Sequence, residues 1–253
     1  MVDVLDDKYK DLFVGSPYMY GDHCVPRVTE ILSAMLHEEY LMNWAEKMGR
    51  FHRDRAKILE SAADKGTLVH AACETFLKTR WITTFDMKYI DRDRDTVKKC
   101  RNAFNSFLNW IDNLDKNYFW KPIYVEHHLI TPCYGGTLDA LLEIGGKLYL
   151  IDFKTSNQLS YKYVLQLAAY RYALRLLYSI EVDGCIVLRL DKYRANSFPE
   201  EMMIDLSDPT MAQFMNECEI MFMDLVSAYY NRLYVERYYM SITGKKANGG
   251  YDI

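Results

Sequence analysis

The stretch GTLDALLEIGGKLYLIDFKTS, residues 136–156, combines a hairpin signal with two aspartates and a lysine. Two apolar runs, at 138–144 and 148–153, flank a Gly-Gly pair at 145–146. Glycines are favoured between two β-forming runs because both central positions of the tightest hairpin turns need a positive φ. The segment is therefore predicted to form two antiparallel strands joined by a two-residue turn.

This turn determines which residues of the two strands lie opposite each other. With Ile144 opposite Lys147, Asp139 is predicted to face Asp152 directly. Like charges at opposed positions destabilise a sheet, but a divalent cation between them reverses that effect. Lys154 shares the strand face of Asp152 and lies about 7 Å further along, from a rise of roughly 3.3 Å per residue. The hairpin therefore predicts a cation site with an ammonium group beside it.

The second strand of the hairpin is apolar on both faces, which is typical of a strand in the middle of a sheet. Charged groups at the end of such a strand are hard to explain as solvated surface. A buried Asp152–Lys154 ion pair without chemistry is the alternative, but it accounts for only one of the two aspartates. A one-residue bulge, which the sequence does not exclude, would break the predicted pairing.

Composition indicates a globular protein with a sizeable core, since half of the 253 residues are hydrophobic. The net charge of −4 gives no global signature of nucleic-acid binding. It does not exclude such binding, because a metal site collects acidic residues and local patches can contact phosphates. None of the six cysteines is closer to another than Cys73 is to Cys100, so no CxxC spacing for zinc or an iron–sulfur cluster exists.

These scattered cysteines favour reduced thiols and a cytoplasmic location. The first ten residues are acidic and lack an apolar core, so neither a secretory signal nor a transit peptide is expected. No stretch approaches the ~20 apolar residues of a membrane span, and no membrane partner is expected.

The order of elements predicts an α/β fold. A strand at 148–154, a helix at 160–177 and a strand at 185–190 form a β–α–β passage compatible with parallel strands. Ser160 is the expected N-cap of that helix. The remaining expected elements are helices at 28–62, 66–78, 94–114 and 209–237, and strands at 123–130 and 201–206. One domain over 1–253 is predicted, with a helical N-terminal part (1–62), a core (63–206), a C-terminal helix (207–243) and a loose tail (244–253).

Three residues of the helix after Lys154 form one stripe, at the spacing i, i+3 and i+7: Tyr163, Gln166 and Tyr170. A glutamine on an apolar helix must satisfy its amide, and the first turns of this helix can approach Lys154. Phosphate or water binding is one interpretation. A surface glutamine with a core tyrosine fits the spacing equally well.

Two further groups are candidates on weaker grounds. His70 and Glu74 are spaced i, i+4 on a helix, as two ligands of one metal can be, although a lone helical histidine is more often structural. Glu126 is an internal acid in the strand-like VEHHL, where Glu126 and His128 are expected on one face and His127 on the other.

Taken in order, these residues resemble the PD-(D/E)xK nuclease superfamily in its RecB-like branch. The resemblance covers roughly residues 66–178, through Gly66-Thr67-x-x-His70, Glu126, Gly136-Thr137-Leu138-Asp139, Ile151-Asp152-Phe153-Lys154-Thr155-Ser156 and Gln166-Leu-Ala-Ala-Tyr170. The segment Val25–Leu32 is also similar to the entry segment of phage-encoded and mitochondrial genome-maintenance exonucleases. Leu138 replaces the proline that names the superfamily.

The resemblance implies a restriction-endonuclease-like core, with a mixed central sheet flanked by helices. It implies that His70, Asp139, Asp152 and the main-chain carbonyl of Phe153 bind Mg²⁺ or Mn²⁺, with Glu126 as a further possible ligand. Lys154 would position or activate the water that attacks phosphorus. Gln166 and Tyr170 would support the lysine and the DNA backbone. The cysteines that hold an iron–sulfur cluster in some relatives have no counterpart, so no cluster is expected.

The function implied is a metal-dependent DNA exonuclease that hydrolyses phosphodiester bonds without base specificity, in DNA replication, recombination or repair. Its partners would be single- or double-stranded DNA and replication or recombination proteins, in the cytoplasm or, for a phage-encoded enzyme, the host cytoplasm. A structure-selective endonuclease on the same fold is one alternative. A non-catalytic nucleic-acid-binding protein is the other, although Asp139, Asp152 and Lys154 all being present argues against it.

Overall fold

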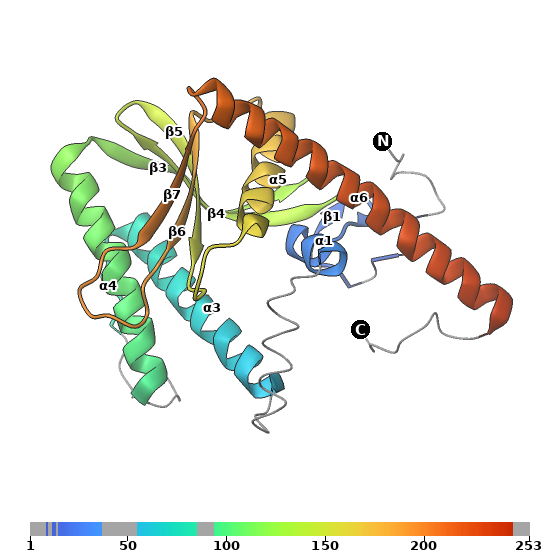
Figure 1. Cartoon of the computed structure of the whole chain (residues 1–253), viewed down its shortest axis with the longest axis horizontal. Helices are drawn as coiled ribbons and strands as arrows, with labels where there is room; N and C mark the ends of the chain where they lie inside the picture. The colour runs from blue at the N-terminus through green and yellow to red at the C-terminus, as the bar shows by residue number, and fades with distance from the viewer. Residues whose placement is uncertain (1–8, 10–11, 14, 37–54, 85–93, 245–253) are drawn as a thin grey trace.

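The computed structural model describes residues 9, 12–13, 15–36, 55–84 and 94–244 (Figure 1). In these residues the main sheet has five strands in the order β3-β4-β5-β6-β7. Neighbouring strands are antiparallel except for β5 and β6, which are parallel. The strands are β3 (Trp120–Ile130), β4 (Gly135–Ile144), β5 (Lys147–Lys154), β6 (Gly184–Arg189) and β7 (Glu200–Asp205), and a small sheet pairs β1 (Met19–Tyr20) with β2 (His23–Cys24).

Helices cover both faces of this mixed sheet, and each face has its own apolar core. One core joins the sheet to α3 (Arg55–Thr79) and α4 (Arg94–Asn117). The other joins it to α1 (Val28–Met35), α5 (Tyr161–Tyr178) and α6 (Pro209–Thr243), the long red helix of Figure 1. The α/β class and the sheet flanked by helices are thus confirmed. The expected helical region 28–62 lies partly outside the described residues, and of the expected tail at 244–253 only Gly244 lies within them.

The hairpin turn forms where the glycine pair predicts it. Gly145 and Gly146 have φ values of +60° and +81°, which a residue with a Cβ rarely adopts. Ile144 pairs with Lys147, and the same register continues as far as Ala140 opposite Ile151. There the β4–β5 ladder ends, because β4 stays with β3 while β5 stays with β6. Asp139 and Asp152 therefore lie just beyond the last pair of the ladder and do not form a directly opposed pair.

The alternation of faces along β4 breaks at Asp139. Leu138 packs in the core beneath α5, whereas Ala140 packs in the core beneath α3 and α4, although alternate residues of a regular strand share a face. On β3, Glu126 lies opposite this break and has a φ of +48°. Such backbone strain costs on the order of 1–3 kcal/mol and is concentrated at functional sites. Both strands are thus irregular at the same level of the sheet.

The helix that connects β5 to the parallel strand β6 begins as predicted. The Ser160 side chain accepts a hydrogen bond from the backbone N–H of Lys162 and caps α5. The prediction that a helix starts at Gly66-Thr67 is wrong, because α3 already begins at Arg55 and passes through both residues. A Cβ at Gly66 would lie 3.5 Å from Thr155 Oγ1, an ordinary van der Waals distance, so the helix passes close to the loop after β5 at this point.

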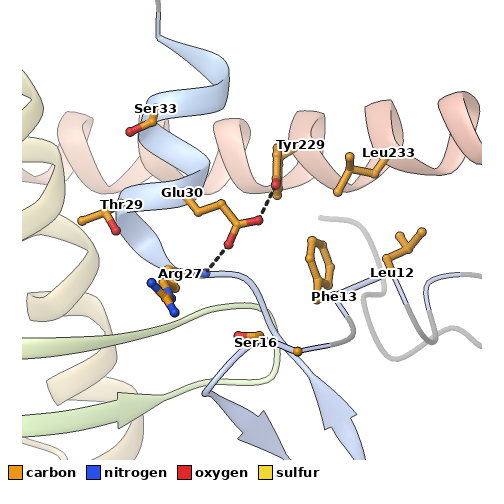
Figure 2. A pocket seen from close by; sticks show the side chains of 10 residues that line it. Leu12, Phe13, Ser16, Arg27, Thr29, Glu30, Ser33, Tyr229 and Leu233 are labelled. Carbon is orange, nitrogen blue, oxygen red and sulfur yellow. Dashed lines mark hydrogen bonds between the residues drawn. The ribbon is translucent and has the colours of Figure 1, made fainter. Parts of the chain in front are cut away.

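Helix α1 is joined to α6 through Glu30, as Figure 2 shows. Its carboxylate accepts hydrogen bonds from the backbone N–H of Arg27 (3.4 Å) and from the hydroxyl of Tyr229 (2.7 Å). A cavity of about 470 Å³ lies beside these groups and is walled by Phe13 and Leu233. Over the described residues, no helix combines the length and the apolar character that crossing a bilayer requires.

Candidate active site

Asp139 lies at the point where β4 separates from β5, and it contacts two other elements. Its Oδ1 lies 3.2 Å from Nδ1 of His70 on α3. Its Oδ2 accepts a hydrogen bond of 2.6 Å from the backbone N–H of Phe153 on β5. Because the ladder has ended, the Asp139 carboxylate takes the place of a backbone acceptor for this N–H. The side chain is consequently held at both oxygens.

Asp152 and Lys154 form the second half of the site, on the side of α5. The Lys154 ammonium donates to Oδ1 of Asp152 (2.9 Å) and to Oε1 of Gln166 (3.1 Å). The Gln166 amide in turn donates to the hydroxyl of Tyr170 at 3.2 Å. The ring of Tyr163 lies beneath the ammonium, with its centroid 4.9 Å from Nζ. The predicted stripe of α5 therefore meets the lysine, and Gln166 and Tyr170 are both buried.

The pKa values of the two aspartates are shifted in opposite directions. Burial, opposed by the Lys154 ammonium and reinforced by the Asp139 charge, raises the pKa of Asp152 to about 6. Burial also disfavours ionised Asp139, but His70, Lys154 and the Phe153 N–H hold its pKa below the usual value. For Lys154, burial is outweighed by Asp152 and Asp139, so its pKa is raised. The lysine is thus a charged hydrogen-bond donor at neutral pH.

Glu126 joins this site from β3, but two other candidates do not. Ligand atoms of His70, Glu126 and Asp139 all lie within 4.8 Å of one another. Burial, with the nearby Asp139 charge, raises the pKa of Glu126 to about 7. Glu74 instead pairs with Lys78 at 2.7 Å, so the i, i+4 pair with His70 does not form a ligand pair.

His128 lies elsewhere, against Thr137, with its Nδ1 2.9 Å from the Thr137 hydroxyl. The expectation that it shares a face with Glu126 is wrong, because the positive φ at Glu126 interrupts the alternation of β3. His127 points to α5, where its Nε2 lies 3.0 Å from the hydroxyl of Tyr178.

A cavity of about 540 Å³ opens beside Gln166 and Tyr170 and extends to the start of α1. Tyr18 lines it, and its hydroxyl lies 2.8 Å from that of Thr137. No feature of the sequence points to Tyr18, which comes from the segment before β1. Gly136 also lines the cavity, and a Cβ at this position would lie 2.5 Å from the Tyr170 ring. The Gly-Gly pair at 135–136 is therefore the sequence feature that could have indicated this close approach.

The site fits a divalent cation on the chemistry of its donors. Carboxylates and an imidazole are suitable ligands for Mg²⁺ or Mn²⁺. Oδ2 of Asp152 is buried and accepts no hydrogen bond, although it has Lys154 Nζ at 2.8 Å as an ion-pair neighbour. A carboxylate oxygen can accept more than one such contact, so the ammonium leaves this oxygen able to bind a cation as well. His70, Glu126 and Asp139 supply the other nearby donors.

Comparison with known proteins agrees with this geometry. The model of the PD-(D/E)XK nuclease superfamily matches residues 40–237, well over half of the chain, and the chain belongs to that superfamily. Its mixed sheet flanked by helices is the restriction-endonuclease-like arrangement. No curated protein matches the sequence. Among solved structures, the crystal structure of SSO0001 is 18% identical, with 61% of this chain and 72% of that chain covered and a TM-score of 0.24.

Membership of the superfamily makes the protein a nuclease and therefore a hydrolase that acts on nucleic acid. Nucleases of this superfamily typically use divalent metal ions, which agrees with the donors gathered around Asp139.

Proposed function

We propose that this protein is a Mg²⁺- or Mn²⁺-dependent deoxyribonuclease of the RecB-like branch, which degrades DNA from strand ends without base specificity. The observation that carries the proposal is the Lys154 ammonium held between Asp152 and Gln166 next to the buried Asp139. Asp139, Asp152 and Lys154 lie on one sheet and Gln166 lies on the helix α5 packed against it, which supports a single nuclease domain over 1–253. The same resemblance supports a role in DNA replication, recombination or repair.

The residues that would hold the cation are His70, Asp139, Asp152 and the main-chain carbonyl of Phe153, with Glu126 adjacent. When bound, such an ion neutralises charge on the scissile phosphate and makes water a better nucleophile. The side chains prepare the site for it, because the hydrogen bonds of Asp139 to His70 and Phe153 fix its carboxylate before substrate arrives.

Lys154 acts as a donor in this scheme. Its ammonium is charged, so it orients a water through a hydrogen bond and offsets the charge that develops on the phosphate oxygens. Gln166 limits the positions open to the ammonium, and Tyr170 limits those open to Gln166. Lys154 is thus assigned to the reaction, and Gln166 and Tyr170 to positioning it.

Cleavage without base specificity is consistent with the described residues around the site, which offer carboxylates, an ammonium and a glutamine, groups suited to phosphate, water and metal. Preference for ends is supported by the resemblance of Val25–Leu32 to the entry segment of exonucleases. A structure-selective endonuclease remains the alternative on the same site.

The test compares linear end-labelled DNA with closed circles, each single- and double-stranded, in Mg²⁺, Mn²⁺ or EDTA. Wild type should degrade linear substrates only and only with metal. Asp152→Asn, which preserves the shape of the side chain, should lose at least about 10²-fold in rate because the proposed ligand loses its charge. Asp112→Asn is the matched control, since that exposed carboxylate pairs with Lys116 in the same helix.

Each result has a defined reading. Cleavage of circles would replace the exonuclease by the endonuclease. If no substrate is cleaved with either metal, the result would favour a non-catalytic nucleic-acid-binding protein. Full activity of Asp152→Asn would overturn the assignment of the site.

A further inference from the structure

The carboxyl end of β6 carries a basic surface that lies next to Lys154. Because β5 and β6 are parallel, their last residues are partners, and Lys154 pairs with Arg189. The segments 94–101 and 189–200 together contain seven lysines and arginines against three acidic residues, whereas the whole chain has a net charge of −4. We name this surface the basic ridge; its cations are Arg94, Lys98, Lys99, Arg101, Arg189, Lys192 and Arg194.

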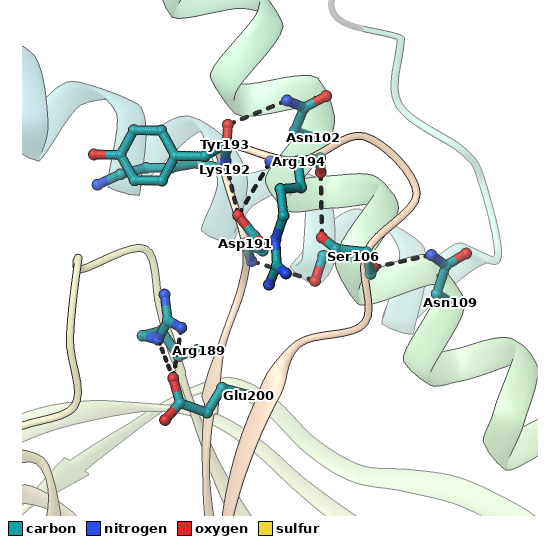
Figure 3. A network of polar contacts seen from close by, with 10 residues as sticks. Asn102, Ser106, Asn109, Arg189, Asp191, Lys192, Tyr193, Arg194 and Glu200 are labelled. Atoms are coloured by element: carbon teal, nitrogen blue, oxygen red, sulfur yellow. Dashed lines mark hydrogen bonds and ion pairs between the residues drawn. The ribbon is translucent and has the colours of Figure 1, made fainter.

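The loop between β6 and β7 is fixed to α4, as Figure 3 shows. Asn102 donates to the main-chain carbonyl of Lys192 (3.2 Å), and Asn109 donates to that of Ser197 (2.9 Å). The carboxylate of Asp191 accepts from two backbone N–H groups of the same loop and from the Arg194 guanidinium. These bonds join the loop to α4 and hold the two basic segments together.

The ridge is also bonded directly to the segment that follows the proposed catalytic lysine. The Lys192 ammonium donates to the carbonyl of Thr155 at 2.6 Å. The hydroxyl of Tyr193 donates to the Asn157 side chain at 2.8 Å. A strand that leaves the scissile phosphate in this direction therefore meets the ridge first.

Tyr193 gives this surface a second feature that simple basic patches lack. The residue is 56% exposed, and two ammonium groups lie close to its ring, Lys192 at 5.4 Å and Lys99 at 5.8 Å from the centroid. An exposed aromatic ring between cations is the combination that binds single strands, since a base stacks on the ring while the cations contact phosphates. A base must be unpaired to stack in this way.

We infer that the basic ridge binds a single strand of the DNA substrate next to the scissile phosphate, with one base stacked on Tyr193 and neighbouring phosphates contacted by Lys98 and Arg101. This inference rests on the proposed nuclease function and adds to it the form of the substrate. The charges act on any sequence, and stacking tolerates every base, so the ridge increases affinity without creating specificity.

The test measures binding of a fluorescent single-stranded oligonucleotide to the full chain by anisotropy, in EDTA so that no cleavage occurs, at several salt concentrations. Tyr193→Leu should weaken binding at least about five-fold, because it removes the stacking surface. Tyr193→Phe is its control: it loses only the bond to Asn157 and should bind like wild type. Removing charge with Lys98→Gln and Arg101→Gln should lower the slope of log affinity against log salt by about 0.7 per residue.

Lys147→Gln controls for the change in charge, since Lys147 is exposed at the hairpin turn, at the other end of β5 from Lys154. It should leave affinity and slope unchanged. If wild type cleaves DNA but the ridge variants bind the oligonucleotide like wild type, the proposed role of the ridge is refuted while the nuclease function stands. Equal losses for Tyr193→Leu and Tyr193→Phe would overturn the stacking. If wild type neither binds nor cleaves DNA, the proposed function fails and the ridge fails with it.

Discussion

Replacing Gly136 with alanine should disable the lysine from a distance, without touching any charged group. The added Cβ would lie 2.5 Å from Cε1 of Tyr170 and 3.0 Å from its hydroxyl oxygen, about 1 Å inside ordinary contact. Tyr170 is buried but lines the cavity of about 540 Å³, so the ring can escape the new methyl group only by moving away from its present position. Its bond to Gln166 is already 3.2 Å long and would break if the ring moved away.

Two costs follow from this displacement. Overpacking a buried contact destabilises a fold by about 1–3 kcal/mol. Loss of the Gln166–Tyr170 bond adds about 1 kcal/mol. The free energy of unfolding should therefore fall by about 2–4 kcal/mol, measured by urea denaturation. Cleavage should slow by up to about 10²-fold, because a misplacement of about 1 Å near a reacting group has that effect. Substrate affinity should change little.

A double-mutant cycle tests the reasoning. Tyr170→Leu removes the ring with which the new methyl group of Gly136→Ala clashes. The two changes together should therefore destabilise the protein by less than the sum of the single effects. Single-turnover cleavage with enzyme in excess separates the slower chemical step from any change in binding. An additive cycle would refute the steric argument. Wild-type cleavage by Gly136→Ala would show that the link from Tyr170 to Lys154 has no role in the reaction.

Three further changes probe the scaffold. Glu219→Gln should lower the free energy of unfolding by about 3 kcal/mol in urea denaturation, because the guanidinium groups of Arg171 and Arg175 would lose a buried carboxylate partner; an unchanged midpoint would contradict this. Tyr134→Phe should cost about 1 kcal/mol in the same assay, since a fully buried hydroxyl donates to a carbonyl of α5. For Asp191, burial is outweighed by bonds from the loop backbone and from an arginine, so its pKa is lowered. Its stabilising effect is then complete above the unfolded pKa of about 4 and is lost as pH falls through the lower folded value, so Asp191→Asn should be destabilising at pH 7 but nearly neutral close to pH 2.

Much of the hairpin was predictable because its determinants are local. The positive φ required at Gly145 and Gly146 selects the turn, and the turn sets the register as far as Ala140 opposite Ile151. The cap at Ser160 is equally local. By contrast, Gly66 was misread as a helix start, because α3 already begins at Arg55 and continues through this glycine.

The contacts that complete the site depend on long-range pairings. Tyr18 reaches Thr137 from the segment before β1, and Lys192 reaches the carbonyl of Thr155 from the loop after β6. Neither contact has a periodic or motif signal in the sequence. Each depends on sheet order, since β6 must lie parallel to β5 before its loop can approach the segment that follows Lys154.

The end of the β4–β5 ladder links the fold to the chemistry. A ladder continued by two more pairs, as far as Leu138 opposite Phe153, would satisfy the Phe153 N–H with a backbone carbonyl and leave Asp139 free to turn. Because β4 remains with β3 and β5 with β6, the strands separate at this point, and the Asp139 carboxylate becomes the acceptor for that N–H. The irregular backbone at Glu126, opposite Asp139, accompanies the placement of this further acid beside Asp139 and His70. The separation of two strands thus creates both the space for a cation and the hydrogen bonds that orient its proposed ligand.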